Sequence, residues 1–485
     1  MSKLISELAA ICGPEYVSDK LVDRVCHTRD CGPSPGGLPT VIVRPRTTEQ
    51  VCAIVRLANR ERTPIFVWGR SSTFIGHGIR EGCILLALDL MNRIEKVDFA
   101  NQTVTVQTGA IWHAVDVELG KRGWELHVPG SGGMFVCTVG GSVAYNSVPH
   151  GLAEYGMTGE GVVALEVVLP YGEVIYTGSA ANRASADLGF ERYANGPDLA
   201  GLFIGSCGVF GIITKVTYRI RQRPEAERFA FYGFDSVDTA VDAAQALQRR
   251  QVPTHLVQVF GGQKPLGVEG QAFLHLIIRD SRAAADERLA AGHSICAAFN
   301  GVRLDEKATE RYWVNHMYSW LRNTPPEVYY SDRPYTCPEA SAFIPTQRVK
   351  DAIRYLLNYE VEHAEEFARY GIRIKCYDVY YSRNAAFLWI DTLYPELDLE
   401  AWQYGLKMRA DYSEYLWSHY GSPGGILAPL APHIMPKLGA GYELMKMLKR
   451  TLDPNNILNP GILGLGDPSP GPSPDRGGER EEVGR

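Results

Sequence analysis

Small residues fill the loop Val67-Trp-Gly-Arg-Ser-Ser-Thr-Phe-Ile-Gly76, which follows directly on a short strand pattern at residues 64–68. Small side chains in succession at the end of a strand allow several backbone N–H groups to converge on one point. A concave loop of this kind binds a diphosphate without needing a lysine. A tight surface turn is the alternative interpretation of this loop taken alone.

Two further glycine-rich segments follow. The first reads Pro129-Gly-Ser-Gly-Gly-Met-Phe-Val-Cys-Thr-Val-Gly-Gly-Ser-Val-Ala-Tyr-Asn-Ser147. Within it, the four-residue spacing of Thr138, Ser142 and Asn146 places these polar side chains on one helical face, beside a glycine pair where backbone can approach a flat polar ligand. The second, Gly205-Ser-Cys-Gly-Val-Phe-Gly-Ile-Ile-Thr214, is a glycine turn that leads into a strand. Each segment is a weak signal alone, because glycine turns between strands are common.

The composition is that of a large globular protein and excludes several classes of function. Of the 485 residues, 45% are hydrophobic and 21% charged, and the formal net charge is −6, so we expect no basic nucleic-acid surface. No apolar run approaches the about 18–20 residues of a membrane span, and we expect no signal peptide. The ten cysteines include no Cys-x-x-Cys pair, which disfavours zinc ribbons, bacterial-type iron–sulfur runs and thioredoxin chemistry. So many free thiols favour the reducing cytoplasm as the location.

Several motifs of common enzymes are absent. The sequence has no P-loop, no Gly-x-Gly-x-x-Gly after a strand and no His-Glu-x-x-His. The segment Gly32-Pro-Ser-Pro-Gly36 matches Gly-x-Ser-x-Gly, but the two prolines that flank its serine prevent a strand-to-helix elbow. We therefore exclude a nicotinamide dinucleotide site of the usual kind and disfavour a serine hydrolase.

The composition changes along the chain and divides it into four parts. Residues 1–222 alternate β-branched runs with glycine loops, and residues 223–425 repeat a strand–helix rhythm that predicts an antiparallel sheet covered by helices. Residues 426–466 are mostly helical and return to the first part. Residues 467–485 form a tail of Pro, Gly and charged residues with nothing to bury, which we expect to be disordered.

Apolar periodicity predicts individual helices within these parts. One is expected at residues 48–60, with Thr48 as its N-cap. Others are expected at about residues 236–250, 281–298 and 346–369.

Taken together, the glycine segments and several other stretches resemble the flavoprotein superfamily of vanillyl-alcohol oxidase and p-cresol methylhydroxylase. Within it, the chain is most similar to the branch of the glycolate oxidase catalytic subunit and D-lactate dehydrogenase. The resemblance is dense over residues 40–220 and returns at about 440–462. The segments that carry it, besides the three loops above, are Val43-Arg-Pro-Arg-Thr-Thr-Glu-Gln-Val, Asp89-Leu-Met-Asn-Arg-Ile-Glu-Lys-Val-Asp98, Glu154-Tyr-Gly156, Glu166-Val-Val-Leu-Pro-Tyr-Gly172 and Asp453-Pro-Asn-Asn-Ile-Leu-Asn-Pro-Gly461.

The resemblance implies an α+β protein with a two-subdomain FAD-binding fold of the p-cresol methylhydroxylase type and an antiparallel-sheet cap domain covered by helices. It implies FAD between two α/β subdomains over residues 1–222, with the cap lying over the isoalloxazine. The first loop would hold the diphosphate, the second would run along the flavin, and the third would pack near the adenosine end. The implied cofactor-binding residues are Gly69, Arg70, Ser71, Ser72, Thr73, Gly76, Ser131, Thr138, Gly141, Ser142, Asn146, Gly208, Ile212 and Ile213.

Two departures from the family pattern matter. Some relatives attach FAD through a histidine in the first loop, and the corresponding residue here is Ser72, so we expect non-covalent FAD; attachment through a cap residue such as Tyr380 or Tyr381 stays open. The 2-hydroxy-acid dehydrogenases of this branch often carry a His-x-Gly-Asp-Gly-Asn-x-His signature and a later Glu-His-Gly that ligate a divalent metal. The corresponding segments read Tyr380-Tyr-Ser-Arg-Asn-Ala-Ala-Phe-Leu-Trp389 and Ser418-His-Tyr-Gly421. No histidine pair at ligand spacing remains, so we expect no catalytic metal.

Oxidation of an alcohol requires a proton acceptor and, for an acid or a phenolate, a group that binds the anion. The sequence offers His419 as the base, Arg383 as the anion clamp, and Tyr381 or Tyr420 as hydrogen-bond partners.

The cap strand that contains Tyr381 alternates between two faces. Tyr377, Val379 and Tyr381 share one face of the sheet, Asp378 and Tyr380 share the other, and one of the two faces must meet the flavin.

These observations predict an FAD-dependent dehydrogenase or oxidase that acts on CH–OH donors, with a 2-hydroxy acid such as D-lactate or glycolate as substrate. A para-substituted phenol or a benzylic alcohol is an alternative substrate, because the cap is rich in aromatic residues and lacks the metal signature. A flavin subunit of a multiprotein electron-transfer complex is a further alternative, with a protein or a quinone as electron acceptor. Whether the chain forms a homo-oligomer or a hetero-complex is left open.

Overall fold

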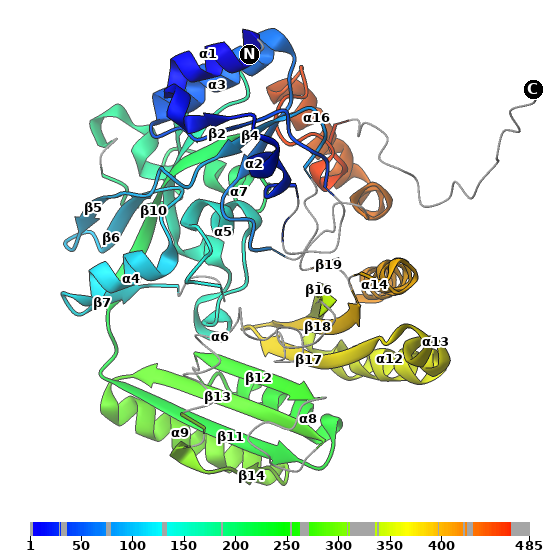
Figure 1. The fold of residues 1–485 in the computed structure, drawn as a ribbon. Coiled ribbons are helices and arrows are strands. Elements are labelled where there is room, and N and C mark those ends of the chain that lie inside the picture. The colour runs from blue at the N-terminus through cyan, green and yellow to red at the C-terminus, as the bar shows by residue number, and fades with distance from the viewer. Residues whose placement is uncertain are drawn as a thin grey trace, which may run out of the picture.

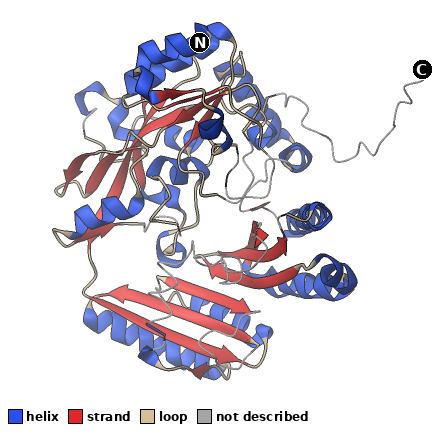
Figure 2. Cartoon of the chain, in the orientation of Figure 1, coloured by secondary structure: helices blue, strands red, loops and turns tan. Residues whose placement is uncertain are grey.

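The computed structural model contains three β-sheets, and helices cover each of them (Figures 1 and 2). The first two sheets are built from residues up to 222 and the third from residues 226–423, so strands of the third sheet pair only with one another among the residues that the structure describes. The structure describes residues 3–28, 30, 36–73, 79–128, 133–185, 188–252, 255–261, 271–307, 309–310, 335–336, 339–395, 397–420, 422–423 and 430–466.

The first sheet has four strands in the order β1-β2-β4-β3, and β4 pairs in parallel with both β2 and β3. Its strands are short and apolar on both faces, as expected for parallel strands that lie between other elements. The elements are α1 (Lys3–Cys12), β1 (Val17–Ser18), α2 (Leu21–Val25), β2 (Val41–Val43), α3 (Thr48–Glu61), β3 (Ile65–Trp68) and β4 (Ile84–Ala87).

The predicted helix at residues 48–60 is α3, but its N-cap is Thr47, and the expectation that Thr48 caps it is wrong. Thr47 has extended backbone, and its side chain accepts a hydrogen bond from the backbone N–H of Gln50. Thr48 is already helical, and its hydroxyl instead donates to the buried carboxylate of Glu166, 2.6 Å away. Either of the two adjacent threonines could cap the helix. Because Thr48 is bonded to Glu166, Thr47 is the cap.

The second sheet has six strands and is antiparallel, with β10 at its centre and β7 paired to the end of β10. Its strands are β5 (Ile94–Asp98), β6 (Thr103–Gln107), β7 (Trp124–Leu126), β8 (Val162–Val168), β9 (Val174–Tyr176) and β10 (Ile212–Gln222). The helices beside it are α4 (Trp112–Gly120), α5 (Val139–Tyr145), α6 (Leu152–Tyr155) and α7 (Leu199–Phe203).

The third sheet has nine strands, all paired antiparallel, in the order β14-β11-β13-β12-β17-β18-β16-β19 with β15 beside β18. Its strands are β11 (Ala226–Phe234), β12 (Leu256–Gly261), β13 (Ala272–Asp280), β14 (Val302–Arg303), β15 (Tyr335–Thr336), β16 (Glu339–Pro345), β17 (Arg373–Tyr381), β18 (Ala385–Pro395) and β19 (Ser422–Pro423). The helices are α8 (Val237–Arg249), α9 (Arg282–Ala298), α12 (Val349–Glu362), α13 (Ala364–Tyr370) and α14 (Leu399–Tyr420). The single helix expected at 346–369 is therefore two helices, which meet at His363.

The helices cover one face of the third sheet, and the other face is turned toward the first two sheets (Figure 1). The side chains of β17 alternate between these two faces. Tyr377, Val379 and Tyr381 pack in the core with the helices. Tyr380 instead packs with Leu152 of α6, on the side of the other two sheets. The face that carries Asp378 and Tyr380 is therefore the one that meets the rest of the molecule.

The chain returns to the first two sheets through α15 (Ala431–Ile434) and α16 (Ala440–Leu452). Beyond α16, a buried ion pair between Lys449 and Asp453, 2.6 Å apart, fixes the following turn. The Asp453 carboxylate also accepts hydrogen bonds from the backbone N–H groups of Ile457 and Leu458. This turn brings the C-terminal segment against β3, where Leu458 forms a parallel bridge with Ile65.

Candidate functional site

One cavity lies where the loops of the first two sheets meet the third sheet. Its walls come mainly from β3 and the loop after it, the segment around α5, the turn before β10, the C-terminal segment and strand β18, with Ile79, Leu88 and Thr108 between them. The predicted cofactor-binding residues that line it are Gly69, Arg70, Ser71, Ser72, Thr73, Thr138, Gly141, Ser142, Gly208, Ile212 and Ile213. The three glycine segments are thus far apart in sequence but line one cavity.

The first loop has the backbone geometry of an anion site. Ser71 has a left-handed φ of 51°, a conformation that serine adopts rarely and that turns successive N–H groups toward one side. A side chain at Gly69 would come within 2.7 Å of the Thr138 hydroxyl, so only glycine lets the first and second loops meet. This arrangement fits a cofactor with a diphosphate, because the loop offers backbone donors and little steric bulk.

The hydroxyls of the second segment have structural partners. Thr138 caps α5 by accepting a hydrogen bond from the N–H of Gly141, and Ser142 accepts one from the indole N–H of Trp112 at 2.9 Å. Asn146 ends α5 with a left-handed φ of 56°, and its side chain accepts from the N–H of Gly159. Asn146 is not among the described residues that line the cavity. Of the three polar residues expected on one helical face, Thr138 and Ser142 therefore line the cavity and Asn146 does not.

Two of the predicted cofactor residues, Gly76 and Ser131, lie outside the described residues. The expected disordered tail at 467–485 also lies outside them.

Sequence reasoning missed Asn459, which joins two of the loops. Its side-chain oxygen accepts a hydrogen bond from the N–H of Val67, and its side-chain nitrogen donates to the carbonyl of Cys207 at 2.7 Å. A side chain at Gly208 would meet Asn459 at 2.6 Å, and the φ of 75° at Gly208 also favours glycine. The signal was present, since Asn459 lies in the segment Asp453–Gly461 that carried part of the family resemblance.

Cys137 is a second lining residue that the sequence did not single out. Its Sγ lies 3.0 Å from the Oγ of Ser72, so the second segment contacts the first loop at Ser72.

The third sheet contributes Phe387 and Trp389 of β18 to the cavity. In the register of β17 and β18, Phe387 is opposite Tyr380 and Trp389 is opposite Asp378. Gln258 of β12 donates a hydrogen bond to the Asp378 carboxylate at 2.9 Å and lies 3.3 Å from the Tyr380 hydroxyl. The sheet therefore presents aromatic rings to the cavity with a polar group beside them.

The structure places two of the predicted catalytic residues, Tyr381 and Arg383, outside the cavity lining. Tyr381 is buried in the core between the sheet and its helices, where burial raises the pKa of its hydroxyl. Arg383 lies in the turn between β17 and β18, is exposed, and donates to the backbone carbonyl of Glu154 at 2.7 Å.

The other two, His419 and Tyr420, lie together at the end of α14 and also do not line the cavity among the described residues. His419 is exposed, its Nδ1 lies 2.9 Å from the carbonyl of Tyr415, and its ring stacks on that tyrosine. The hydroxyl of Tyr420 shares a hydrogen bond with Tyr415. The structure does not bring these four candidates together, and their catalytic roles stay predictions.

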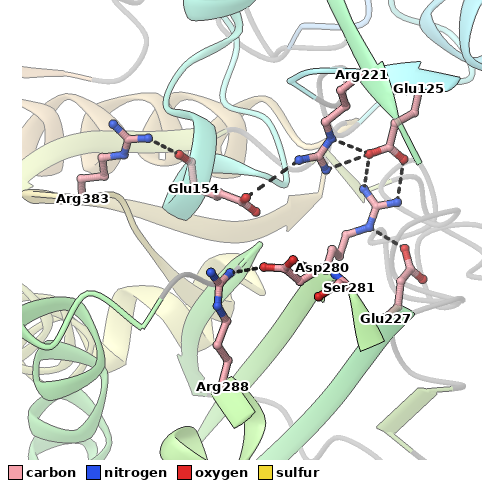
Figure 3. Close-up of polar contacts among 9 residues, drawn as sticks. Glu125, Glu154, Arg221, Glu227, Asp280, Ser281, Arg288 and Arg383 are labelled. Atoms are coloured by element: carbon pink, nitrogen blue, oxygen red, sulfur yellow. Dashed lines mark hydrogen bonds and ion pairs between the residues drawn. The ribbon is translucent and has the colours of Figure 1, made fainter. Parts of the chain in front are cut away.

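A network of charges joins the third sheet to the second sheet (Figure 3). Glu125 of β7 binds Arg221 of β10 and Arg279 of β13, each at 2.7 Å. Arg279 also binds Glu227 of β11, and Arg221 lies 3.8 Å from Glu154 of α6. Because these residues come from both parts of the fold, the network fixes how the third sheet sits over the cavity.

Within the described residues, no group of three or more His, Cys, Asp or Glu side chains could hold a metal ion. The expectation of no catalytic metal stays a prediction, because parts of the chain fall outside that description. No helix in the described part of the chain is long and apolar enough to span a bilayer.

Two known protein families match parts of the chain. Residues 39–178 match the FAD binding domain, and residues 437–463 match the C-terminal domain of FAD linked oxidases. The first match contains the first two cavity loops and the second contains Asn459. The FAD predicted from the sequence is therefore confirmed as the cofactor.

The relatives agree with the predicted branch. The glycolate oxidase subunit GlcD of Bacillus subtilis is 25% identical over 94% of this chain and 96% of its own length. The D-lactate dehydrogenase of Archaeoglobus fulgidus is 26% identical over 87% of this chain and 90% of its own. The mitochondrial D-lactate dehydrogenase [cytochrome] 1 of Saccharomyces cerevisiae is 28% identical, but the match spans 53% of this chain and 44% of that protein.

Solved structures confirm the predicted α+β fold of the p-cresol methylhydroxylase type. The structure of p-cresol methylhydroxylase with substrate bound has a TM-score of 0.80 and 18% identity, and the match covers 96% of both chains. The 4-ethylphenol oxidase from Gulosibacter chungangensis, in its isoeugenol complex, has a TM-score of 0.80 and 17% identity over 96% of this chain and 97% of its own. At these identities the likeness concerns the fold.

Proposed function

We propose that this chain, an FAD-linked oxidoreductase of the glycolate oxidase and D-lactate dehydrogenase type, oxidises the hydroxyl-bearing carbon of a small 2-hydroxy acid. One observation carries the proposal: the cavity has the glycine loops on one wall and strand β18 on the other, so a flat cofactor and a small substrate can lie face to face. Two relatives that match over most of their length, a glycolate oxidase subunit and a D-lactate dehydrogenase, support the substrate class.

FAD, when bound, supplies the acceptor for a hydride removed from the substrate carbon. The chain's own residues would bind FAD and orient the substrate. The loop at residues 69–73 would hold the phosphates of FAD with backbone N–H groups, and Asn459 ties Val67, just before that loop, to the turn before β10. Phe387 and Trp389 give the cavity apolar surface from β18, which would exclude water from a substrate bound there. Since Ser72 cannot form the histidyl linkage, we propose that FAD is held without a covalent bond.

A para-substituted phenol or a benzylic alcohol is the second candidate substrate, and the aromatic wall favours it. Phe387 and Trp389 would stack on an aromatic substrate, whereas Arg70 is the one cationic side chain among the described lining residues. We also propose that the electrons pass from the flavin to a partner protein, a quinone or oxygen. This holds whether the chain works alone, as a homo-oligomer or as the flavin subunit of a complex. The cytoplasm stays the predicted location.

The deciding experiment is anaerobic reduction of the bound flavin. Purified protein is mixed in the absence of oxygen with D-lactate, glycolate and other 2-hydroxy acids, and separately with 4-alkylphenols, while the flavin absorbance is followed. Bleaching by 2-hydroxy acids alone supports the first candidate, and bleaching by phenols alone replaces it with the second. Acid precipitation tests the attachment: free FAD in the supernatant is expected, and yellow precipitated protein would contradict non-covalent binding.

A further inference from the structure

The face of the third sheet that is turned toward the cavity is largely aromatic and apolar, but Glu227 and Asp378 are carboxylates on it; Glu227 is paired with Arg279, and Asp378 lies on the strand next to the cavity wall. Asp378 is 8% exposed, and its partner on the neighbouring strand is Trp389, which lines the cavity. Residues directly opposite on antiparallel strands have Cβ atoms about 4.5–5.5 Å apart. The carboxylate therefore lies behind the aromatic wall, next to Trp389, although Asp378 is not itself among the described residues that line the cavity.

The surroundings of Asp378 hold the carboxylate ready to accept a hydrogen bond or a proton. The amide of Gln258 donates to it at 2.9 Å, which fixes its orientation. Gln258 is fully buried, and its side-chain oxygen accepts no hydrogen bond from any residue that the structure describes. Gln258 has no exposed surface, so Asp378, at 8% exposed, is the member of the pair that a ligand can reach.

The Asp378 carboxylate differs from its apolar neighbours on this face of the sheet. The same face of β12 and β17 carries Leu256 and Tyr380, which pack against Leu152 of α6 without a charge. Buried carboxylates in clefts are typical of sites that move protons.

We propose that Asp378 accepts the proton of the substrate hydroxyl, with Gln258 positioning its carboxylate; this rests on the oxidation of a CH–OH donor proposed above. The O–H bond breaks and its proton passes to Asp378. The C–H bond breaks, its hydrogen leaves with both electrons to FAD, and the carbonyl forms from the pair left on oxygen. One proton and one hydride leave the alcohol, so atoms and charges balance.

The test compares two ligands that differ by the hydroxyl and cannot be oxidised. 2-Hydroxy-2-methylpropanoate has a hydroxyl but no hydrogen on its carbon, and 2-methylpropanoate lacks the hydroxyl. Calorimetric titration of the holoenzyme should show that the hydroxyl improves binding at least about tenfold, since a hydrogen bond to a charged group contributes about 1.5–3 kcal/mol. In Asp378→Asn this preference should fall to about threefold or less, and Asp378→Glu should recover part of it.

The same variants are then tested for flavin reduction by a 2-hydroxy acid. Loss of a general base lowers the rate by about 100-fold or more, and Asp378→Asn should show this while its FAD content stays that of the wild type. Gln258→Met, which keeps Asp378 and removes the donor, should lose less of both the rate and the hydroxyl preference. Gln258→Met also tests the proposal if Asp378→Asn does not fold. Asp411→Asn on α14, whose carboxylate accepts from Tyr359 on the helix-covered side, is the matched control and should change neither quantity.

The outcomes separate this inference from the proposed function. If 2-hydroxy acids bleach the wild-type flavin and the hydroxyl preference is the same in wild type, Asp378→Asn and Gln258→Met, the role of Asp378 is overturned and the function stands. If no CH–OH donor bleaches the wild type, the function fails and the role of Asp378 in it fails with it. A lower preference and a lower rate with unchanged FAD content support the role.

Discussion

Glu125 of β7 and Arg279 of β13 form an ion pair, 2.7 Å from carboxylate to guanidinium, although their strands belong to different sheets (Figure 3). Their side chains are 7% and 14% exposed, so neither charge is well solvated. The pair joins the part of the fold that carries the glycine loops to the part that carries Asp378.

Removal of one partner should therefore destabilise the protein strongly. Glu125→Gln leaves Arg279 and Arg221 without their shared carboxylate, and we expect the free energy of unfolding to fall by about 3 kcal/mol. Urea unfolding followed by circular dichroism measures this. Arg354→Gln, which breaks an exposed ion pair with Asp238, is the control and should cost less than about 1 kcal/mol. Equal effects of the two variants would show that the buried network contributes no more than a surface pair.

The second prediction concerns Asn459, which binds the backbone of Val67 and of Cys207. Asn459→Ala removes both hydrogen bonds and frees the first loop from the turn before β10. We expect about tenfold weaker FAD binding, because loss of a hydrogen bond that leaves a buried partner costs about 1–3 kcal/mol. Fluorescence titration of the apoprotein with FAD measures the affinity. Asn455→Ala, four residues earlier with an exposed hydrogen bond to Asn59, should bind FAD like the wild type.

The cofactor side of the cavity could be predicted because its requirements are local. Backbone that approaches a diphosphate needs small residues in succession, and such runs are visible in the sequence as Gly69–Thr73 and around Gly208. The α+β cap could also be predicted, since strand and helix periods differ. Asn459 was missed because its partners lie 392 and 252 residues away, and no local pattern encodes such contacts.

The substrate side could not be predicted in the same way. Alternation assigned Tyr381 and Asp378 to opposite faces of one strand, but only packing shows which face the helices cover. The choice of Tyr381, His419 and Arg383 rested on residue type, and residue type does not report burial or direction. Asp378 has a neighbour in Gln258 that lies 120 residues away and becomes visible only in the folded sheet.

The third prediction concerns pH. Burial lowers the pKa of His275 to about 3, so this side chain is neutral in the folded protein and takes up a proton on unfolding below its ordinary pKa near 6.5. The unfolded state then binds more protons, and stability falls as the pH falls from about 6.5 toward 3. His275→Phe should remove about 1.4 kcal/mol per pH unit from the slope of unfolding free energy between pH 6 and 4.5.

Urea unfolding at several pH values measures that slope. His433→Gln, at an exposed position of α15 beside Glu414, is the control. A slope for His275→Phe equal to that of the wild type would mean that His275 is protonated in the folded protein.

The fourth prediction uses Cys137, which lines the cavity and contacts Ser72. Iodoacetamide should modify Cys137 in the apoprotein, and bound FAD should slow this at least about tenfold, since a ligand that occupies the cavity covers the thiol. Mass spectrometry of peptides identifies the site. Cys12 is the internal control, because burial raises its pKa to about 11 and it should stay unmodified in both forms. Equal labelling of Cys137 with and without FAD would show that the cofactor does not reach this wall.

The last prediction separates the two tyrosine-bearing faces of β17. The Tyr381 hydroxyl is buried among the helices and makes no hydrogen bond with the described residues, so Tyr381→Phe removes an unsatisfied polar group. We expect the variant to be about 1 kcal/mol more stable and to reduce its flavin at the wild-type rate. Tyr380→Phe, on the cavity side, loses its hydroxyl beside Gln258 and should lower the rate of flavin reduction while the protein stays folded. Stopped-flow absorbance and urea unfolding give both quantities for both variants. A loss of rate in Tyr381→Phe, with Tyr380→Phe unchanged, would assign the chemistry to the face that the helices cover and would overturn the placement of the substrate between β18 and the glycine loops.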